Sequence, residues 1–149
     1  MTRMWWAVVT IVVITLAAVG AGYLWIQANA DQLQLHGHTY DTVIRQTEAE
    51  RQKGLSGTKS LPAHQSMLFV FPSDSRWGIW MKDMNYPIDI VWLDNGQRVV
   101  YIVKDAQPSS YPTIFRPATY SRYVIELASG TIERTGISIG DKAMLPSEL

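Results

Sequence analysis

The sequence contains no cysteine, which excludes disulfides, thiolate nucleophiles and cysteine-based metal centres. Charged residues are also scarce, at 17% of 149 residues, and the 13 Lys and Arg equal the 13 Asp and Glu. No run of Lys or Arg appears, although clustered basic residues are the electrostatic footprint of nucleic-acid binding. We therefore expect no nucleic-acid partner.

Signatures of catalysis and of metal binding are missing as well. The chain has no glycine-rich phosphate-binding loop, and no known spacing sets a serine or aspartate beside His64 as in a nucleophilic triad. His36 and His38 would share one face of an extended segment, but no third ligand is placed by spacing. We interpret this pair as solvent-exposed and expect neither a metal nor a cofactor.

The N-terminus carries an uncharged apolar run over residues 5–26. A run of roughly 20 apolar residues spans the hydrocarbon core of a bilayer as a helix. Arg3 precedes the run and the next charge is Asp31, so the N-terminus is expected to stay in the cytoplasm. Aromatic rings, which favour the membrane interface, lie at both ends of the run: Trp5, Trp6, Tyr23 and Trp25. The sequence predicts a single-pass anchor over residues 1–28, with the lipid bilayer as partner of residues 5–26.

A cleaved signal peptide is the alternative interpretation of this segment. Ala28-Asn29-Ala30 resembles a small-residue cleavage site, and cleavage near Ala30 would release a secreted domain. The apolar run is longer than the roughly 7–15 residues of a signal h-region, which favours the anchor. Either way, the part of the chain after the run is expected outside the cytoplasm.

The remainder divides into a polar tether over residues 29–38 and an exported domain over residues 39–149. Short apolar or alternating runs separated by turn residues are typical of a mainly β domain. We predict a compact antiparallel β-barrel or sandwich with one or two short helices. The predicted strands cover residues 39–45, 67–71, 76–81, 88–93, 98–104 and 123–127, with a terminal hairpin over residues 137–145.

Local signals fix several connections. Thr47 followed by Glu50 is a capping box, which predicts a short helix that ends at Gly54. Asn95-Gly96 between two β-rich runs predicts a hairpin with a type I′ turn. Residues 73–75 are predicted as a turn, residues 105–119 as a long loop, and residues 129–134 as one helical turn that ends near Gly136.

Six phrases of the sequence occur in an order that is similar to a known family. They lie at residues 51–55, 66–72, 80–84, 87–90, 124–130 and 136–141. Together they resemble domain of unknown function family 192 over residues 39–145. The resemblance implies a compact, mostly antiparallel β-domain, often behind a signal peptide or anchor, and it implies no activity. The chain has Asp83-Met84 where the family usually has Asn-Thr, and Ser66 where it often has Gly.

A charged block over residues 80–89 is the best candidate for a site. It places Lys82 and Asp89 between two apolar strands, where charges must be solvated, paired or used by a ligand. Strand parity sets Asp89 on the opposite face from its two Ile neighbours, so an inward carboxylate would need a cation beside it. The candidate binding residues are Arg51, Trp80, Lys82, Tyr86, Asp89 and Glu126.

Two interpretations of these charges remain open, namely that they hold a ligand or that they pair with one another. The first hypothesis is a membrane-anchored extracytoplasmic module that binds a small ligand, such as a sugar or a cell-envelope fragment. Arg51 and Lys82 would then bind polar groups, and Trp80 and Tyr86 would offer stacking surface. The second is a hydrolase with Asp89 as general base and Lys82 stabilising negative charge. The third is a structural domain that meets a protein through a sheet edge.

Overall fold

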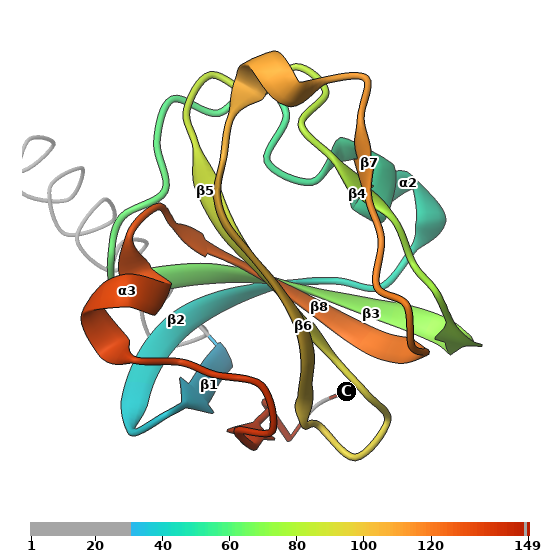
Figure 1. The fold of residues 1–149 in the computed structure, drawn as a ribbon, viewed down its shortest axis with the longest axis vertical. Coiled ribbons are helices and arrows are strands. Elements are labelled where there is room, and N and C mark those ends of the chain that lie inside the picture. The colour runs from blue at the N-terminus through green and yellow to red at the C-terminus, as the bar shows by residue number, and fades with distance from the viewer. Residues whose placement is uncertain (1–30, 148) are drawn as a thin grey trace, which may run out of the picture. The chain divides into compact units, whose positions relative to one another are not determined.

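A seven-stranded sheet holds most of the chain described by the computed structural model, which covers residues 31–147 and 149. Its strands lie in the order β6-β5-β8-β3-β2-β1-β9, and β4 pairs with β7 in a separate ribbon (Figure 1). The strands are β1 (Asp31–Leu35), β2 (His38–Arg45), β3 (Gln65–Ser75), β4 (Ile79–Trp80), β5 (Ile88–Leu93), β6 (Val99–Ala106), β7 (Ile114–Phe115), β8 (Ser121–Ala128) and β9 (Ala143–Met144). The other elements are α2 (Glu48–Lys53), α3 (Thr131–Thr135) and the 3-10 turn η1 (Pro108–Ser110). The prediction of a mainly β domain with two short helices is confirmed.

The sheet begins earlier than the sequence suggested. β1 pairs antiparallel with β2, and Leu35 faces His38 across a two-residue turn. The turn residues His36 and Gly37 have φ of 49° and 77°, and positive φ at both positions is what a type I′ turn requires. The tether interpretation is therefore wrong for residues 31–38. Buried Leu33 and Leu35 alternate with exposed Gln32 and Gln34, which is the period-two pattern of a strand.

Not every strand pair in the sheet is antiparallel. β2 and β3 run parallel, whereas every other strand pair formed by the described residues is antiparallel. Parallel neighbours need a long crossover connection, and here α2 lies within it. The predicted capping box of α2 is present, with Glu50 N donating to Thr47 Oγ1 and Thr47 N donating to the Glu50 carboxylate. The predicted antiparallel pairing does not hold for β2 and β3, because the connection that contains α2 carries the chain back across the sheet before β3 begins.

The two edge strands of the sheet meet at one end. Val99 N, at the start of β6, donates to Asp141 O at 2.8 Å, and Ala143 N in β9 donates to Gln97 O at 2.9 Å. An isolated bridge between Arg98 and Lys142 continues this contact. The sheet is thus a curled half-barrel, and the residues before β9 reach β6 instead of folding back on themselves. The predicted terminal hairpin over residues 137–145 is wrong for that reason.

Several other local predictions differ in detail. β5 and β6 form the predicted hairpin, but the positive φ falls on Gln97 at 63° and not on Asn95 or Gly96, so the turn is not type I′. Residues 73–75 belong to β3 instead of a turn. The strand expected over residues 76–81 shrinks to Ile79–Trp80 in the small ribbon. The long loop carries η1 and β7, and α3 ends at Gly136 as predicted.

The domain has a hydrophobic cluster on each face of the sheet. In β5 the side chains of Ile88, Ile90 and Trp92 join one cluster, and those of Val91 and Leu93 join the other. The alternation predicted for this strand is confirmed, although all six of its residues are buried. The cluster that contains Trp92 also holds Leu55, Met67, Phe69, Phe71, Ile79, Met81, Ala106 and Val124.

Asp141 fastens the closed end of the sheet to the β1–β2 turn. Its Oδ2 accepts from Ser138 N at 2.8 Å and lies 2.8 Å from His36 Nδ1. The backbone hydrogen bond from Ser138, with a smaller effect of His36, lowers the pKa of Asp141. His36 and His38 are exposed, as predicted. Across residues 31–147 and 149, no group of three or more His, Asp or Glu side chains is arranged to hold a metal ion.

The predicted anchor over residues 1–28 lies outside the described residues and stays a prediction. Within the described part of the chain, no helix has the length and apolar character needed to cross a membrane.

Candidate functional site

A cleft of about 410 Å³ opens between α2 and the β3–β4 connection. Four of the predicted site residues line it, namely Arg51, Trp80, Lys82 and Glu126. The remaining lining residues are Glu48, Gln52, Lys53, Gly54, Leu55, Ser56, Phe69, Phe71, Pro72, Trp77, Gly78, Ile79 and Met84. The cleft therefore joins an apolar wall to a few polar side chains, which is the usual composition of a small-molecule site.

Arg51 is held in place by the backbone. Its Nη1 donates to Val70 O at 3.0 Å and also to Gln46 O, and its guanidinium carbon lies 5.2 Å from the centre of the Phe71 ring. A cation above an aromatic face is attracted by the ring quadrupole. The other guanidinium N–H groups have no hydrogen-bond partner in residues 31–147 and 149. Arg51 thus presents fixed donors at the cleft.

Trp80 and Lys82 come from β4 and the segment after it. Trp80 is 44% exposed, and its ring meets Tyr111 edge-on with centroids 6.2 Å apart. The Lys82 Nζ lies 6.0 Å from the centre of the Trp80 ring. An exposed indole beside an ammonium group offers stacking surface and a positive charge at the same rim.

Glu126 is the most unusual group in the cleft. It lies on β8 opposite Met67 of β3 and Ile90 of β5, two members of the cluster that contains Trp92, and it is 5% exposed. Its Oε2 is buried and accepts no hydrogen bond from any described residue. Burial raises the pKa of Glu126 to about 8, because the charged carboxylate is disfavoured away from water. The side chain is therefore mostly a neutral carboxylic acid at pH 7.

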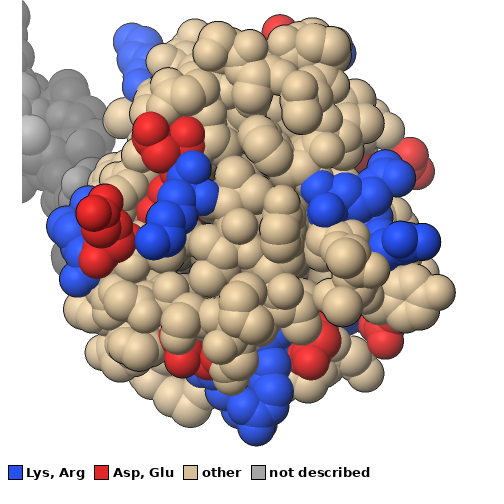
Figure 2. Space-filling view, in the orientation of Figure 1, with Lys and Arg blue, Asp and Glu red and all other residues tan. Residues whose placement is uncertain are grey.

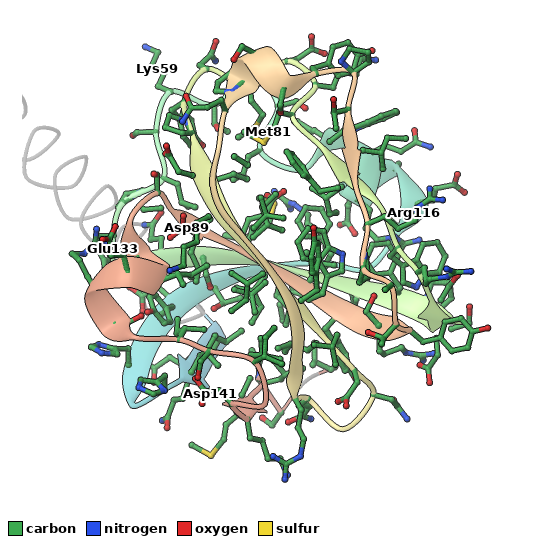
Figure 3. The ribbon with its side chains drawn as sticks, in the orientation of Figure 1. Lys59, Met81, Asp89, Arg116, Glu133 and Asp141 are labelled. Carbon is green, nitrogen blue, oxygen red and sulfur yellow. The ribbon has the colours of Figure 1, made fainter. Side chains whose placement is uncertain are left out.

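Asp89 does not reach the cleft. Its side chain lies on the opposite face of the sheet and is 1% exposed. Oδ1 accepts from Asp105 N and Oδ2 accepts from Ile132 N, both at 2.8 Å. In Figure 3 Asp89 lies beside α3, on the same side of the view as Glu133 and far from Arg116. Asp89 thus ties α3 and the end of β6 to β5, and the prediction that it shares a pocket with Lys82 is wrong.

Tyr86 also lies outside the cleft lining. Its hydroxyl is 2.6 Å from Thr58 Oγ1, and its half-buried ring packs against the cluster that contains Trp92. Burial raises the pKa of Tyr86, and the charge of Glu126 adds to that effect. Tyr86 is therefore a neighbour of Glu126 that helps fasten the segment around Thr58.

The alternative that the candidate charges pair with one another fails on the geometry. Among the described residues, the salt bridges are His36–Asp141 and Arg122–Asp74. Neither contains Arg51, Lys82 or Glu126. Burial of an ionised carboxyl group with no cation within reach lowers the stability of the folded chain. The cleft thus contains polar groups whose contacts within the domain are incomplete.

Sequence reasoning missed the aromatic wall of the cleft. Phe71 and Trp77 stack with centroids 4.3 Å apart and planes 11° apart, and Phe69 also lines the cleft. The run at residues 67–71 reads as a strand buried on both faces, and nothing in that pattern shows that one face opens to a cleft. Gly78 is needed beside this wall, because a Cβ there would collide with Ile114 of β7.

Comparison with known proteins decides the family. The DUF192 family model, described as an uncharacterized ACR, matches residues 31–145. The chain belongs to the DUF192 family. The resemblance drawn from the six phrases is confirmed, and the match includes β1, which that resemblance had left out. Asp83, where the family usually has Asn, adopts φ of 55°, a left-handed conformation that both Asp and Asn tolerate.

Two UPF0127 proteins of known sequence are similar to this chain. A UPF0127 protein of Thermococcus gammatolerans is 32% identical over 108 residues, covering 71% of this chain and 65% of that protein. A UPF0127 protein of Thermococcus kodakarensis is 29% identical over 100 residues, covering 66% of this chain and 60% of that protein. The chain thus spans less than two thirds of the length of either relative.

Two solved structures share the fold. A protein of unknown function from Novosphingobium aromaticivorans superposes with a TM-score of 0.72 at 27% identity, covering 76% of this chain and 83% of that one. A chain from Sinorhizobium meliloti, described as a candidate transcription regulator, gives 0.72 at 27% identity, covering 77% and 92%. On the face drawn in Figure 2, Lys and Arg of this chain form small separate groups, several of them beside acidic residues.

Proposed function

We propose that this chain is a ligand-binding module whose cleft takes a small polar molecule, such as a sugar or a cell-envelope fragment. One observation carries the proposal, namely Glu126, a buried carboxylic acid without a partner among the described residues that opens into an aromatic cleft. An unsatisfied buried polar group lowers stability, and such local violations concentrate at functional sites. A bound ligand would supply the missing hydrogen bond.

The aromatic rim supports a ring-shaped ligand. Trp80 exposes 44% of its surface at the rim, close to Lys82. A sugar ring stacks its apolar face on such an indole, while its hydroxyl groups bond to nearby polar side chains. The hydrolase alternative loses its base, because Asp89 is sealed by two backbone N–H groups on the other face. The third alternative, a structural domain that meets a protein through a sheet edge, gives no physical reason for a buried acid in the cleft.

The cleft proposal predicts measurable binding that depends on Trp80. Titration calorimetry of residues 31–149 with soluble peptidoglycan sugars should give a binding signal, and Trp80→Ala should weaken it by up to about tenfold, because stacking contributes about 0.5–1.5 kcal/mol. Tyr120→Ala is the matched control, since Tyr120 is 67% exposed and does not line the cleft. Equal binding by both variants, or no binding by the wild type across the sugar panel, would refute the proposal.

The module is also proposed to be displayed outside the cytoplasmic membrane by an anchor over residues 5–26. The support is the uncharged apolar run, its flanking aromatic residues and the position of Arg3. We expect the full chain, expressed in a bacterial host, to stay in carbonate-washed membranes and to be digested by protease added from outside. Removal of residues 1–28 should release it. A soluble mature chain that begins near residue 31 would show cleavage instead, and would leave the cleft proposal intact.

A further inference from the structure

The charges that line the cleft are unbalanced. Arg51, Lys53 and Lys82 supply three cations, and the acids are Glu48 and Glu126. Because Glu126 is mostly neutral at pH 7, Glu48 is the single ionised carboxylate of the lining formed by the described residues. Glu48 lies on the first turn of α2, where its Oε1 accepts from Gln52 Nε2 at 3.2 Å. The cleft thus has an excess of positive charge although the whole chain is neutral.

Two of the cations, Arg51 and Lys82, line the cleft together with aromatic rings. Arg51 is fixed by two backbone carbonyls and by the Phe71 ring, so little rotamer entropy is lost when it binds. Lys82 also lines the cleft, next to Trp80. A guanidinium with free N–H groups matches the two oxygens of a carboxylate. Neutral sugars would leave these charges without a counterion.

Glu126 provides the third contact with the ligand. A neutral carboxyl carries one O–H donor, whereas an ionised carboxylate only accepts. Glu126 lies in the lining of the cleft and its Oε2 has no partner among the described residues, so this donor is available to a ligand that fills the cleft. An ionised Glu126 would repel an anion in the same cleft, so a neutral Glu126 and a negatively charged ligand fit each other.

From these contacts we infer that the ligand is an acidic sugar, with its ring on Trp80, its carboxylate between Arg51 and Lys82, and a ring or acyl oxygen accepting from the Glu126 carboxyl. The inference rests on the proposed function and narrows its ligand class. N-Acetylmuramic acid and N-acetylglucosamine are suitable probes, since they differ by the lactyl group that carries the carboxylate.

The first test compares these two sugars by titration calorimetry at pH 6. N-Acetylmuramic acid should bind about tenfold more tightly, because one charge-assisted hydrogen bond is worth on the order of one decade of affinity. Lys82→Gln should reduce that preference several-fold. Lys104→Gln removes the same charge from an exposed position on β6 and should leave the preference unchanged. Equal or tighter binding of the neutral sugar would overturn the inference while the proposed function stands; absence of binding by both would overturn the two together.

The second test uses pH. Around Glu126, the charged and titratable groups are Glu48, Arg51 and Lys53 of α2, with Lys82 after β4 and Tyr86 nearby. Affinity for the acidic sugar should fall about tenfold from pH 6 to pH 9, where a group of pKa about 8 is mostly ionised. Glu126→Gln should remove this dependence, and the neutral sugar should show little of it. A fall that persists in Glu126→Gln would overturn the role given to Glu126.

Discussion

Replacing Glu126 with glutamine is expected to stabilise the folded chain at pH 8 by about 3 kcal/mol. The pKa of Glu126 rises from an ordinary 4.5 to about 8 on folding, and a tenfold change in an acid's dissociation constant corresponds to about 1.4 kcal/mol. The whole rise in pKa would give a somewhat larger effect, but water that reaches the cleft reduces it. Glutamine has nearly the same shape and keeps a polar end, so it removes the cost of the charge and little else.

The pH window follows from the direction in which folding moves the pKa. The folded chain holds the Glu126 proton up to about pH 8, whereas the unfolded chain releases it near 4.5. Stability from this group is therefore fully present below pH 4.5 and is lost progressively as pH rises toward 8. Urea unfolding at pH 4.5 and pH 8 should show wild type and Glu126→Gln close together at the lower pH and well separated at the higher one.

Glu133→Gln is the control for this measurement. Glu133 is an exposed glutamate on α3 and does not line the cleft (Figure 3). Its replacement removes the same formal charge and should change the free energy of unfolding by less than about 0.5 kcal/mol at either pH. If Glu126→Gln is no more stable than wild type at pH 8, or if the gain is equal at both pH values, Glu126 is not a buried acid that folding keeps neutral.

Asp89→Ala is expected to have a large effect of the opposite sign, a loss of about 2–4 kcal/mol in the free energy of unfolding, because two backbone donors, one buried and one part-buried, lose their acceptor. The Asp89 carboxylate accepts from Asp105 N and Ile132 N. Alanine offers neither N–H group an acceptor. An unsatisfied buried donor such as Ile132 N costs about 1–3 kcal/mol, and the part-buried Asp105 N costs less because water can reach it. Chemical unfolding at pH 7 measures the loss directly.

Asp74→Ala provides the comparison for Asp89. Asp74 is exposed, and its ion pair with Arg122 spans 3.9 Å, so its removal should cost about 1 kcal/mol or less. Asp89→Asn retains one acceptor oxygen and should lie between wild type and Asp89→Ala. Binding by folded Asp89→Asn should match wild type, because the cleft is on the other face. An Asp89→Ala chain as stable as wild type would contradict the structural role of Asp89. Selective loss of binding in Asp89→Asn would show that Asp89 takes part in ligand binding.

Glu126 and Asp89 also show how far the sequence reaches into the candidate site. Both are acids between apolar residues in strands, and both were named as candidate binding residues. Strand parity correctly placed Asp89 on the opposite face of β5 from Ile88 and Ile90. Parity alone does not say which face of a sheet opens to solvent, so it could not separate a structural carboxylate from one that lines a cleft.

Elements built from neighbouring residues were predicted well. The capping box of α2, the span of β5 and the end of α3 depend on contacts within a few positions, and short-range patterns record them. Elements that depend on distant partners were predicted poorly. β1 was not predicted, the predicted strand at β4 was too long, and the parallel pairing of β2 with β3 was missed. Each of these features is stabilised by strands that lie elsewhere in the sequence.

The sequence by itself determined a mainly β domain of the DUF192 type, and it named Arg51, Trp80, Lys82 and Glu126 among the candidate binding residues. These conclusions rest on local periodicity and residue type. Only the tertiary structure decided that the four residues meet at one cleft while Asp89 is sealed beside α3. The physical reason is that burial, pairing and pKa depend on what packs against a side chain in space, and the curled sheet brings β3, β8 and α2 together from distant parts of the chain.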